Sequence, residues 1–131
     1  MNVNVVMTED APVIDNHQNF LINQLEGVPQ SACKSLVLNG NLGYLTDIQF
    51  KAVLTKIRKG GAISITASDA MEIATALCWG RIDINTFSSL TSNIHKQYCL
   101  SDIKNILEHN GYVVETASIQ DLVFHIRAKR P

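Results

Sequence analysis

The sequence of 131 residues has no long apolar run and little basic clustering, and each absence excludes a class of protein. No apolar run approaches the roughly 20 residues that a membrane-spanning helix needs, and residues 1–10 carry acids where a secretory signal carries bases. We therefore expect a cytoplasmic protein without membrane contact. The 11 basic residues are balanced by 12 acidic residues. The single basic cluster is Arg127, Lys129 and Arg130 near the chain end, so the charge pattern indicates no nucleic-acid partner.

Cysteine is also scarce. Cys33, Cys78 and Cys99 are odd in number, widely spaced and set in apolar surroundings. This pattern predicts reduced thiols in the core, and it favours neither a disulfide framework nor a metal site.

Motifs of common enzymes are missing as well. The chain contains no G-x-S-x-G, no H-E-x-x-H and no phosphate-binding G-x-x-x-x-G-K-[ST] sequence. Repeats and Pro/Gly-rich linkers are missing too. Because 46% of the residues are hydrophobic and 18% are charged, we expect residues 1–131 to bury a core as a single domain.

Short apolar runs bounded by turn residues alternate with segments of helical periodicity. The strands that we predict are residues 3–7, 35–39 and 62–67, with a final hairpin of residues 112–117 and 122–128. The helices that we predict are residues 16–26, 46–58, 70–79 and 101–111, with caps at Thr46, at Ser68 or Asp69, and at Ser101. Residues 81–93 show no firm period.

This alternation predicts an α/β fold. We expect a three-layer, Rossmann-like arrangement in which a mainly parallel sheet of about five strands has helices on both faces and ends in an antiparallel hairpin.

Three segments and the final hairpin resemble the C-terminal half of class I S-adenosylmethionine-dependent methyltransferases. S-L-V-L-N-G-N-L-G-Y-L-T at residues 35–46 is similar to the family's fourth strand and the loop after it. A-V-L-T-K-I-R-K-G-G-A-I-S-I at residues 52–65 resembles the helix, the L-K-P-G-G turn and the fifth strand, with Lys59 in place of the proline. H-K-Q-Y-C-L-S-D-I-K-N-I-L-E-H-N-G-Y at residues 95–112 resembles the segment before the last strand pair.

The family's cofactor loop has no counterpart here. Class I methyltransferases bind S-adenosylmethionine with a glycine-rich loop after the first strand and an acid at the end of the second. No G-x-G follows residues 3–7, and close backbone approach to such a ligand needs residues without a Cβ. We therefore expect a truncated methyltransferase-like domain without a cofactor of its own. Residues 3–10 could match the family's third strand and the acid after it, or occupy the place of the first strand.

The resemblance also implies candidate site residues, each with a structural alternative. His95 matches a histidine near the family's active-site lid, although a histidine before a helix cap is often structural. Asn39, Gly40, Asn41 and Gly43 could contact a cofactor, or they could form a tight strand-to-helix connection. Asp69 could contact a ligand or cap a helix. Trp79 could line a pocket or anchor a core or an interface.

Two functions remain open from the sequence. The chain could be a non-catalytic binding or assembly module that acts through protein–protein contacts as a homo-oligomer or with a partner protein. Alternatively, it could be one part of a split or oligomeric methyltransferase that shares S-adenosylmethionine with a partner chain. The missing first strands of the family fold predict an unpaired sheet edge beside residues 3–7 or 35–39. Val5 would lie at that edge, as part of an interface or facing solvent.

Overall fold

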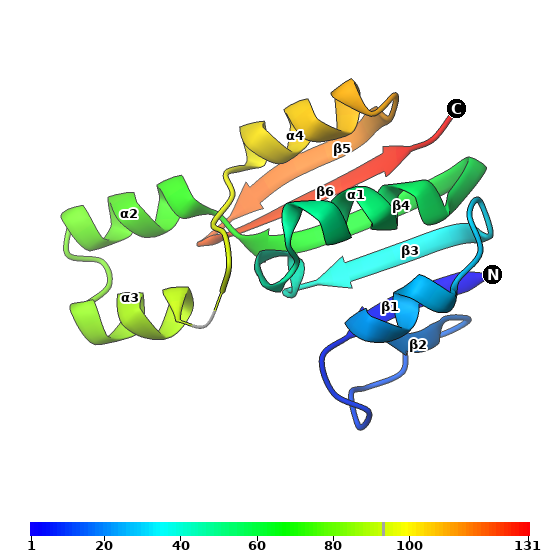
Figure 1. The fold of residues 1–131 in the computed structure, drawn as a ribbon. Coiled ribbons are helices and arrows are strands. Elements are labelled where there is room, and N and C mark those ends of the chain that lie inside the picture. The colour runs from blue at the N-terminus through cyan, green and yellow to red at the C-terminus, as the bar shows by residue number, and fades with distance from the viewer. Residues whose placement is uncertain (93) are drawn as a thin grey trace.

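The computed structural model describes residues 1–92 and 94–131, which form one six-stranded sheet with helices and two short 3₁₀ helices (Figure 1). The strands are β1 (Asn2–Val6), β2 (Gln18–Leu21), β3 (Cys33–Asn39), β4 (Ile57–Ser68), β5 (Val113–Gln120) and β6 (Val123–Lys129). The helices are η1 (Ile22–Gly27), η2 (Leu42–Tyr44), α1 (Asp47–Lys56), α2 (Ala70–Cys78), α3 (Ile84–Thr91) and α4 (Leu100–His109). None of the helices in the described residues is long and apolar enough to span a membrane.

The strand order is β2-β1-β3-β4-β6-β5. The first four strands run parallel, and β6 is antiparallel to both of its neighbours. The predicted mainly parallel α/β sheet with a C-terminal antiparallel hairpin is therefore confirmed, with six strands where about five were expected.

The predicted helix at residues 16–26 is wrong. Residues Gln18 to Leu21 pair in register with Val3 to Val6 as strand β2, and the Asn4 side chain donates to the Asn19 side chain at 3.0 Å. Only the second part of the segment is helical, as the 3₁₀ helix η1, which buries Leu25. As a consequence β1 is an internal strand between β2 and β3, and the predicted free edge beside residues 3–7 or 35–39 does not exist.

Other boundaries shift for local reasons. Helix α1 ends at Lys56, and β4 begins at once with Ile57, which pairs with Cys33. Within β4, Gly60 adopts φ +81° and donates its N–H to the Arg130 carbonyl at 2.6 Å, so the Gly60–Gly61 segment continues the strand instead of preceding it. Helix α4 begins one residue after Cys99, whose N–H donates to Asp102, and not at a Ser101 cap.

The core lies on one face of the sheet. Leu36, Leu38, Ile63, Ile65 and Phe124 alternate along the strands and form a single buried cluster. Helices η1, α1 and α4 cover this face (Figure 1) and contribute the buried side chains Leu25, Phe50, Val53, Leu54, Ile103 and Leu107.

The opposite face differs from the helical layer that we expected there. In the described residues, residues 7–17 connect β1 to β2 without a helix and cover this face beside those two strands, where the Asn19 side chain donates to the Ala11 carbonyl at 3.1 Å. Over β3, β4 and β6 most of the alternate positions are polar, with Ser35, Ser64, Thr66, His125 and Arg127, although Val37 and Ala62 also lie on this face. We call this polar surface the open face.

Helices α2 and α3 extend beyond the carboxyl ends of the strands (Figure 1). Helix α3, which falls in the segment without a firm period, buries none of its residues. The prediction of three core thiols is wrong for Cys78, which is exposed near the end of α2, whereas Cys33 is buried and Cys99 is half-buried.

Candidate functional site

The carboxyl ends of β1, β3 and β4 meet at one edge of the sheet, where α/β proteins bind their ligands. The connection after β1 covers the opposite face from helix α1, which follows β3. Strand β1 connects to β2 on one side of it, and β3 connects to β4 on the other side. Strands β1 and β3 therefore flank the topological switch point of the sheet. Several cavities lie at this edge in the described residues, and the loop after β3 separates two of them.

Tight geometry explains both glycines of that loop. Gly40 adopts φ +77°, which side chains disfavour, and its N–H donates to the Thr66 carbonyl at 2.6 Å. A Cβ on Gly43 would lie 3.0 Å from the Lys96 carbonyl oxygen, and the Gly43 carbonyl accepts the His95 N–H at 2.7 Å. Both glycines are thus needed by the strand-to-helix connection itself.

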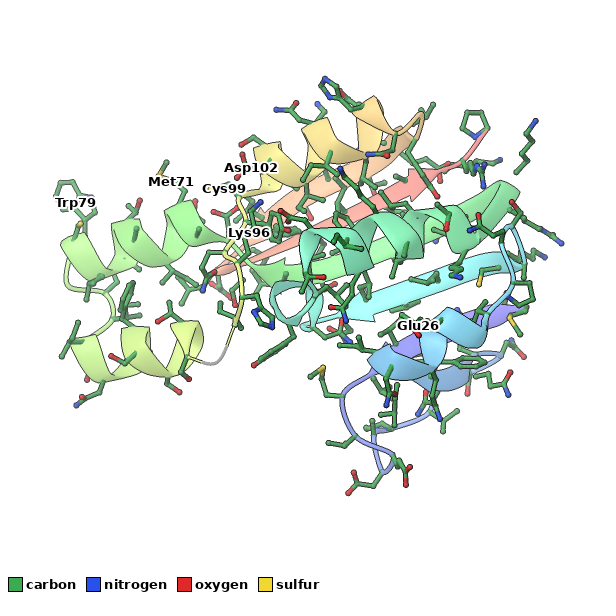
Figure 2. All side chains as sticks on the ribbon, in the orientation of Figure 1. Glu26, Met71, Trp79, Lys96, Cys99 and Asp102 are labelled. Carbon is green, nitrogen blue, oxygen red and sulfur yellow. The ribbon has the colours of Figure 1, made fainter. Side chains whose placement is uncertain are left out.

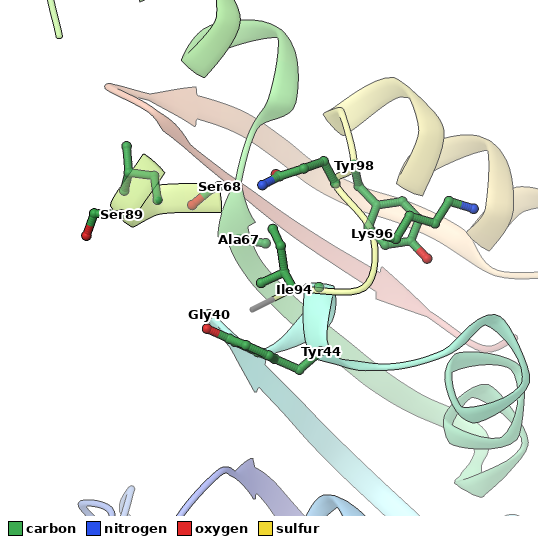
Figure 3. Close-up of a pocket in the computed structure, with 11 residues that line it drawn as sticks. Gly40, Tyr44, Ala67, Ser68, Ser89, Ile94, Lys96 and Tyr98 are labelled. Carbon is green, nitrogen blue, oxygen red and sulfur yellow. The ribbon is translucent and has the colours of Figure 1, made fainter. Parts of the chain in front are cut away.

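The first cavity, of about 200 Å³, lies between the loop after β3, the end of β4 and helix α3 (Figure 3). Its walls include Gly40, Gly43, Ser68, Ser89 and Gln97. Within residues 1–92 and 94–131, the Gln97 Nε2 is buried without a hydrogen-bond partner. Because an unpaired buried donor is costly, this cavity favours a group that accepts a hydrogen bond.

The second cavity, of about 250 Å³, lies at the ends of β1 and β3 and contains Asn39 and Asn41 in its wall. Asn41 is 3% exposed, and its Nδ2 donates to the Val5 carbonyl at 2.6 Å, which fixes the orientation of the amide. The Asn41 Oδ1 is buried and has no hydrogen-bond partner among the described residues. The loop thus brings the predicted candidates Asn39 and Asn41 together at one cavity, and Gly40 and Gly43 at the other.

The other two candidates lie apart from these cavity walls. His95 is exposed, although its neighbours Ile94 and Lys96 line the first cavity. Asp69 is buried and caps helix α2, because its Oδ1 accepts the Glu72 N–H at 3.0 Å. Its Oδ2 accepts the Leu100 N–H at 2.9 Å, so one carboxylate fixes the starts of two helices.

A polar cluster beside the first cavity was missed by sequence reasoning. Asp47 Oδ1 lies 3.4 Å from Lys96 Nζ and accepts the Tyr98 hydroxyl at 3.3 Å, and the Lys96 ammonium lies 5.1 Å from the centre of the Tyr98 ring. Burial, together with the Asp47 carboxylate, raises the pKa of Tyr98. The cluster ties residues 96–98 to the start of α1. Its partners are separated by about fifty residues, so no spacing rule could have found it.

Comparison with solved structures identifies the fold. The chain is similar to an S-adenosylmethionine-dependent methyltransferase from Mesorhizobium loti, with a TM-score of 0.64 and 14% identity over 98% of this chain and 79% of that chain. A second such enzyme, from Archaeoglobus fulgidus, gives a TM-score of 0.65 and 13% identity over 97% of this chain and 75% of that chain. The PH0226 protein from Pyrococcus horikoshii OT3 gives a TM-score of 0.64 and 11% identity over 99% of this chain and 71% of that chain.

No protein-family model matches the sequence, and no curated protein resembles it. The solved structures show that the chain has the class I S-adenosylmethionine-dependent methyltransferase fold and corresponds to part of longer methyltransferase chains. The resemblance predicted from the sequence is confirmed.

The residues at the carboxyl edge do not fit the cofactor of that fold. Strand β1 is followed by Met7, Thr8 and Glu9, without a glycine, and strand β2 by Ile22 and Asn23, without an acid. The described residues that line the second cavity include neither a glycine nor a carboxylate. A nucleoside-type cofactor needs close backbone approach and an acid for its ribose hydroxyls. In the described residues, no group of three or more His, Cys, Asp or Glu could hold a metal ion.

Proposed function

We propose that this chain is a non-catalytic methyltransferase-like module that acts through protein–protein contacts. The observation that carries the proposal is the end of strand β1, where Met7, Thr8 and Glu9 follow without the glycine that close approach of a nucleoside-type cofactor needs. The described lining of the second cavity also contains no acid to hold a ribose.

Exposed apolar side chains on the projecting helices support a role in assembly. Met71 and Trp79 extend from the helix α2 region (Figure 2), and Trp79 is 79% exposed. Ile84, at the start of α3, is also mostly exposed. Aromatic residues and methionine are enriched in protein interfaces. We place the module in the cytoplasm, because the thiol of Cys78 is exposed and unpaired and would persist in a reducing compartment.

Calorimetric titration with S-adenosylmethionine and S-adenosylhomocysteine tests the proposal. We expect no saturable heat with protein at tens of micromolar, because a Kd near 1 μM already requires about 8 kcal/mol of binding free energy. The matched control variant is Asn39→Ala, in the wall of the second cavity, with folding checked by circular dichroism. Saturable heat in the wild type that is lost in Asn39→Ala would overturn the non-catalytic assignment.

The two unpaired buried groups favour a second candidate. Asn41 Oδ1 and Gln97 Nε2 leave one acceptor and one donor at the carboxyl edge. One part of an oligomeric methyltransferase, with the glycine-rich loop supplied by another chain, would retain such groups. That function predicts saturable S-adenosylmethionine binding by a complex purified from the native host and none by the chain alone.

A further inference from the structure

The two edges of the sheet are protected very differently. Strand β2 has four residues and runs directly into η1. Strand β5 has eight residues and, in the described residues, pairs on one side only, with β6. The outward N–H and C=O groups of a long edge strand can accept another strand.

Five consecutive residues of β5 carry no device against such pairing. Residues 116–120 read T-A-S-I-Q, without charge or proline. The register irregularity between Val114 and Thr116 bounds this segment at one end, and Asp121, at φ +56°, bounds it at the other. Natural sheets usually blunt an edge of this length with lysine, proline or a bulge within it.

A largely apolar groove of about 420 Å³ runs beside this segment, and its lining also includes the charged residues Asp69, Glu72 and Lys104. Its wall on β5 is formed by Ala117 and Ile119. The helices contribute Met71 from α2, and Cys99 and Leu100 from the start of α4 (Figure 2). Ile119 is 44% exposed. A free edge beside a side-chain groove is the arrangement in which a strand adds to a sheet, with the groove receiving alternate side chains.

We infer that the occupant is a second copy of this chain, which pairs antiparallel through β5 about a twofold axis at Ser118. The inference rests on the proposed assembly function and names its partner. In this register Ser118 lies opposite Ser118 of the second copy, and Thr116 lies opposite Gln120. Ile119 of each copy then lies opposite Ala117 of the other, so a large side chain enters the groove where the facing wall is small.

Two carboxylates meet at each end of this pairing, where Arg127 can offset their repulsion. The register places Asp121 of the second copy opposite Glu115, and two opposed carboxylates repel each other. Glu115 Oε1 lies 3.5 Å from Arg127 Nε. The Arg127 side chain is 51% exposed, so its guanidinium has donors left for a second carboxylate. By symmetry this contact forms twice, which a partner without the same sequence would have to reproduce.

The size of the contact sets the expected affinity. Five residues of strand pairing and one groove from each copy lie at the low end of specific interfaces, below the roughly 1,200 Å² of standard complexes. We therefore expect a dimer that dissociates in the micromolar range.

Analytical ultracentrifugation from about 1 to about 200 μM tests the dimer. The wild type should move from the 14.5 kDa monomer toward twice that mass. Ile119→Lys should raise the dimer Kd at least about tenfold, because it places two cations in the grooves. The control Ile48→Lys changes an isoleucine on α1 that is 82% exposed, and it should leave the Kd unchanged. A wild type that stays monomeric throughout, or a dimer that Ile119→Lys leaves intact, overturns the inference.

Cysteine cross-linking tests the register independently. In a Cys78→Ser background, Ser118→Cys should form a covalent dimer when oxidised with diamide, because residue 118 meets its own copy across the axis at strand-pair distance. Gln120→Cys, on the same face, should stay monomeric because it lies opposite Thr116. Cross-linking of Gln120→Cys but not Ser118→Cys overturns the register. These outcomes do not depend on S-adenosylmethionine, so they are separable from failure of the proposed function.

Discussion

Neighbouring residues of β6 show how different the two faces of the sheet are. Phe124 and Ile126 are buried against the helices, whereas His125 and Arg127, which alternate with them, are exposed on the open face. The buried face holds the core cluster. On the open face, the Thr66 hydroxyl lies 3.1 Å from His125 Nδ1 and Arg127 donates to Ser64 at 3.3 Å. A largely parallel sheet can therefore be stabilised from one side when its other side is built from polar residues.

The buried face and the open face also have different roles, because one stabilises the fold and the other is available for contacts. Apolar burial stabilises one face, at about 25 cal/mol for each Å² removed from water. The open face contributes little burial, so its residues can change with little loss of stability. Contacts with other molecules are then free to use this face and the β5 edge.

The largest effect that we predict compares adjacent residues of β6. Phe124→Ala should reduce the free energy of unfolding by about 3–5 kcal/mol, because it leaves a cavity in the core. His125→Ala should change it by less than about 0.5 kcal/mol, because the side chain is exposed. Urea denaturation monitored by circular dichroism measures both. Equal losses for the two variants would mean that the open face is buried in solution.

The alternation that separates the faces was visible in the sequence but was interpreted too broadly. A-I-S-I-T-A at residues 62–67 and F-H-I-R-A-K at residues 124–129 have period two, which is typical of half-buried strands. The βα alternation led instead to an expectation of helices on both faces. The mainly parallel sheet and its final hairpin could still be predicted, because short apolar runs and turn residues specify the strands locally. The strand order depends on tertiary pairing and was not predicted.

The errors arose where tertiary pairing overrides local periodicity. Phe20, Leu21 and Leu25 have helical spacing, yet residues 18–21 pair with β1, and only the remainder is helical. Helix α3 was missed although Ile84, Phe87 and Leu90 recur at helical spacing, because eight residues give only a short periodic signal. The loop at residues 39–43 could be predicted as a candidate site from its position after a strand. The unpaired state of Asn41 Oδ1 depends on packing against β1, which no local signal encodes.

A buried hydrogen bond of Tyr112 provides a second test of the buried face. Its hydroxyl donates to the Leu54 carbonyl at 2.6 Å, and both groups are buried. Tyr112→Phe should cost about 1–2 kcal/mol, because it leaves that carbonyl unpaired. Tyr44→Phe, at the wall of the first cavity, is the control for loss of a tyrosine hydroxyl.

The same tyrosine predicts a pH dependence. Burial raises the pKa of Tyr112 to about 12, above the unfolded value near 10. A raised pKa means that folding favours the protonated phenol, so its stabilisation is complete below about pH 10 and is lost as the pH rises toward 12. The difference in unfolding free energy between wild type and Tyr112→Phe should shrink over that interval. A difference that stays constant would contradict the raised pKa.

The smallest effect belongs to the open face. Arg127 and Glu115 form an ion pair at 3.5 Å with side chains that are 51% and 43% exposed. A double-mutant cycle of Arg127→Ala and Glu115→Ala should give a coupling of about 0.2–0.5 kcal/mol at low salt, because water screens the pair. At about 1 M salt the Debye length falls to roughly 3 Å, and the coupling should vanish. The cycle should be measured at protein concentrations below the dimer Kd. A coupling above about 2 kcal/mol that persists in high salt would show that the Arg127–Glu115 pair is desolvated. The open face would then have to be covered even in the monomer. A coupling that rises only at protein concentrations above the Kd would instead place Asp121 of a second copy beside Arg127, as pairing through β5 requires.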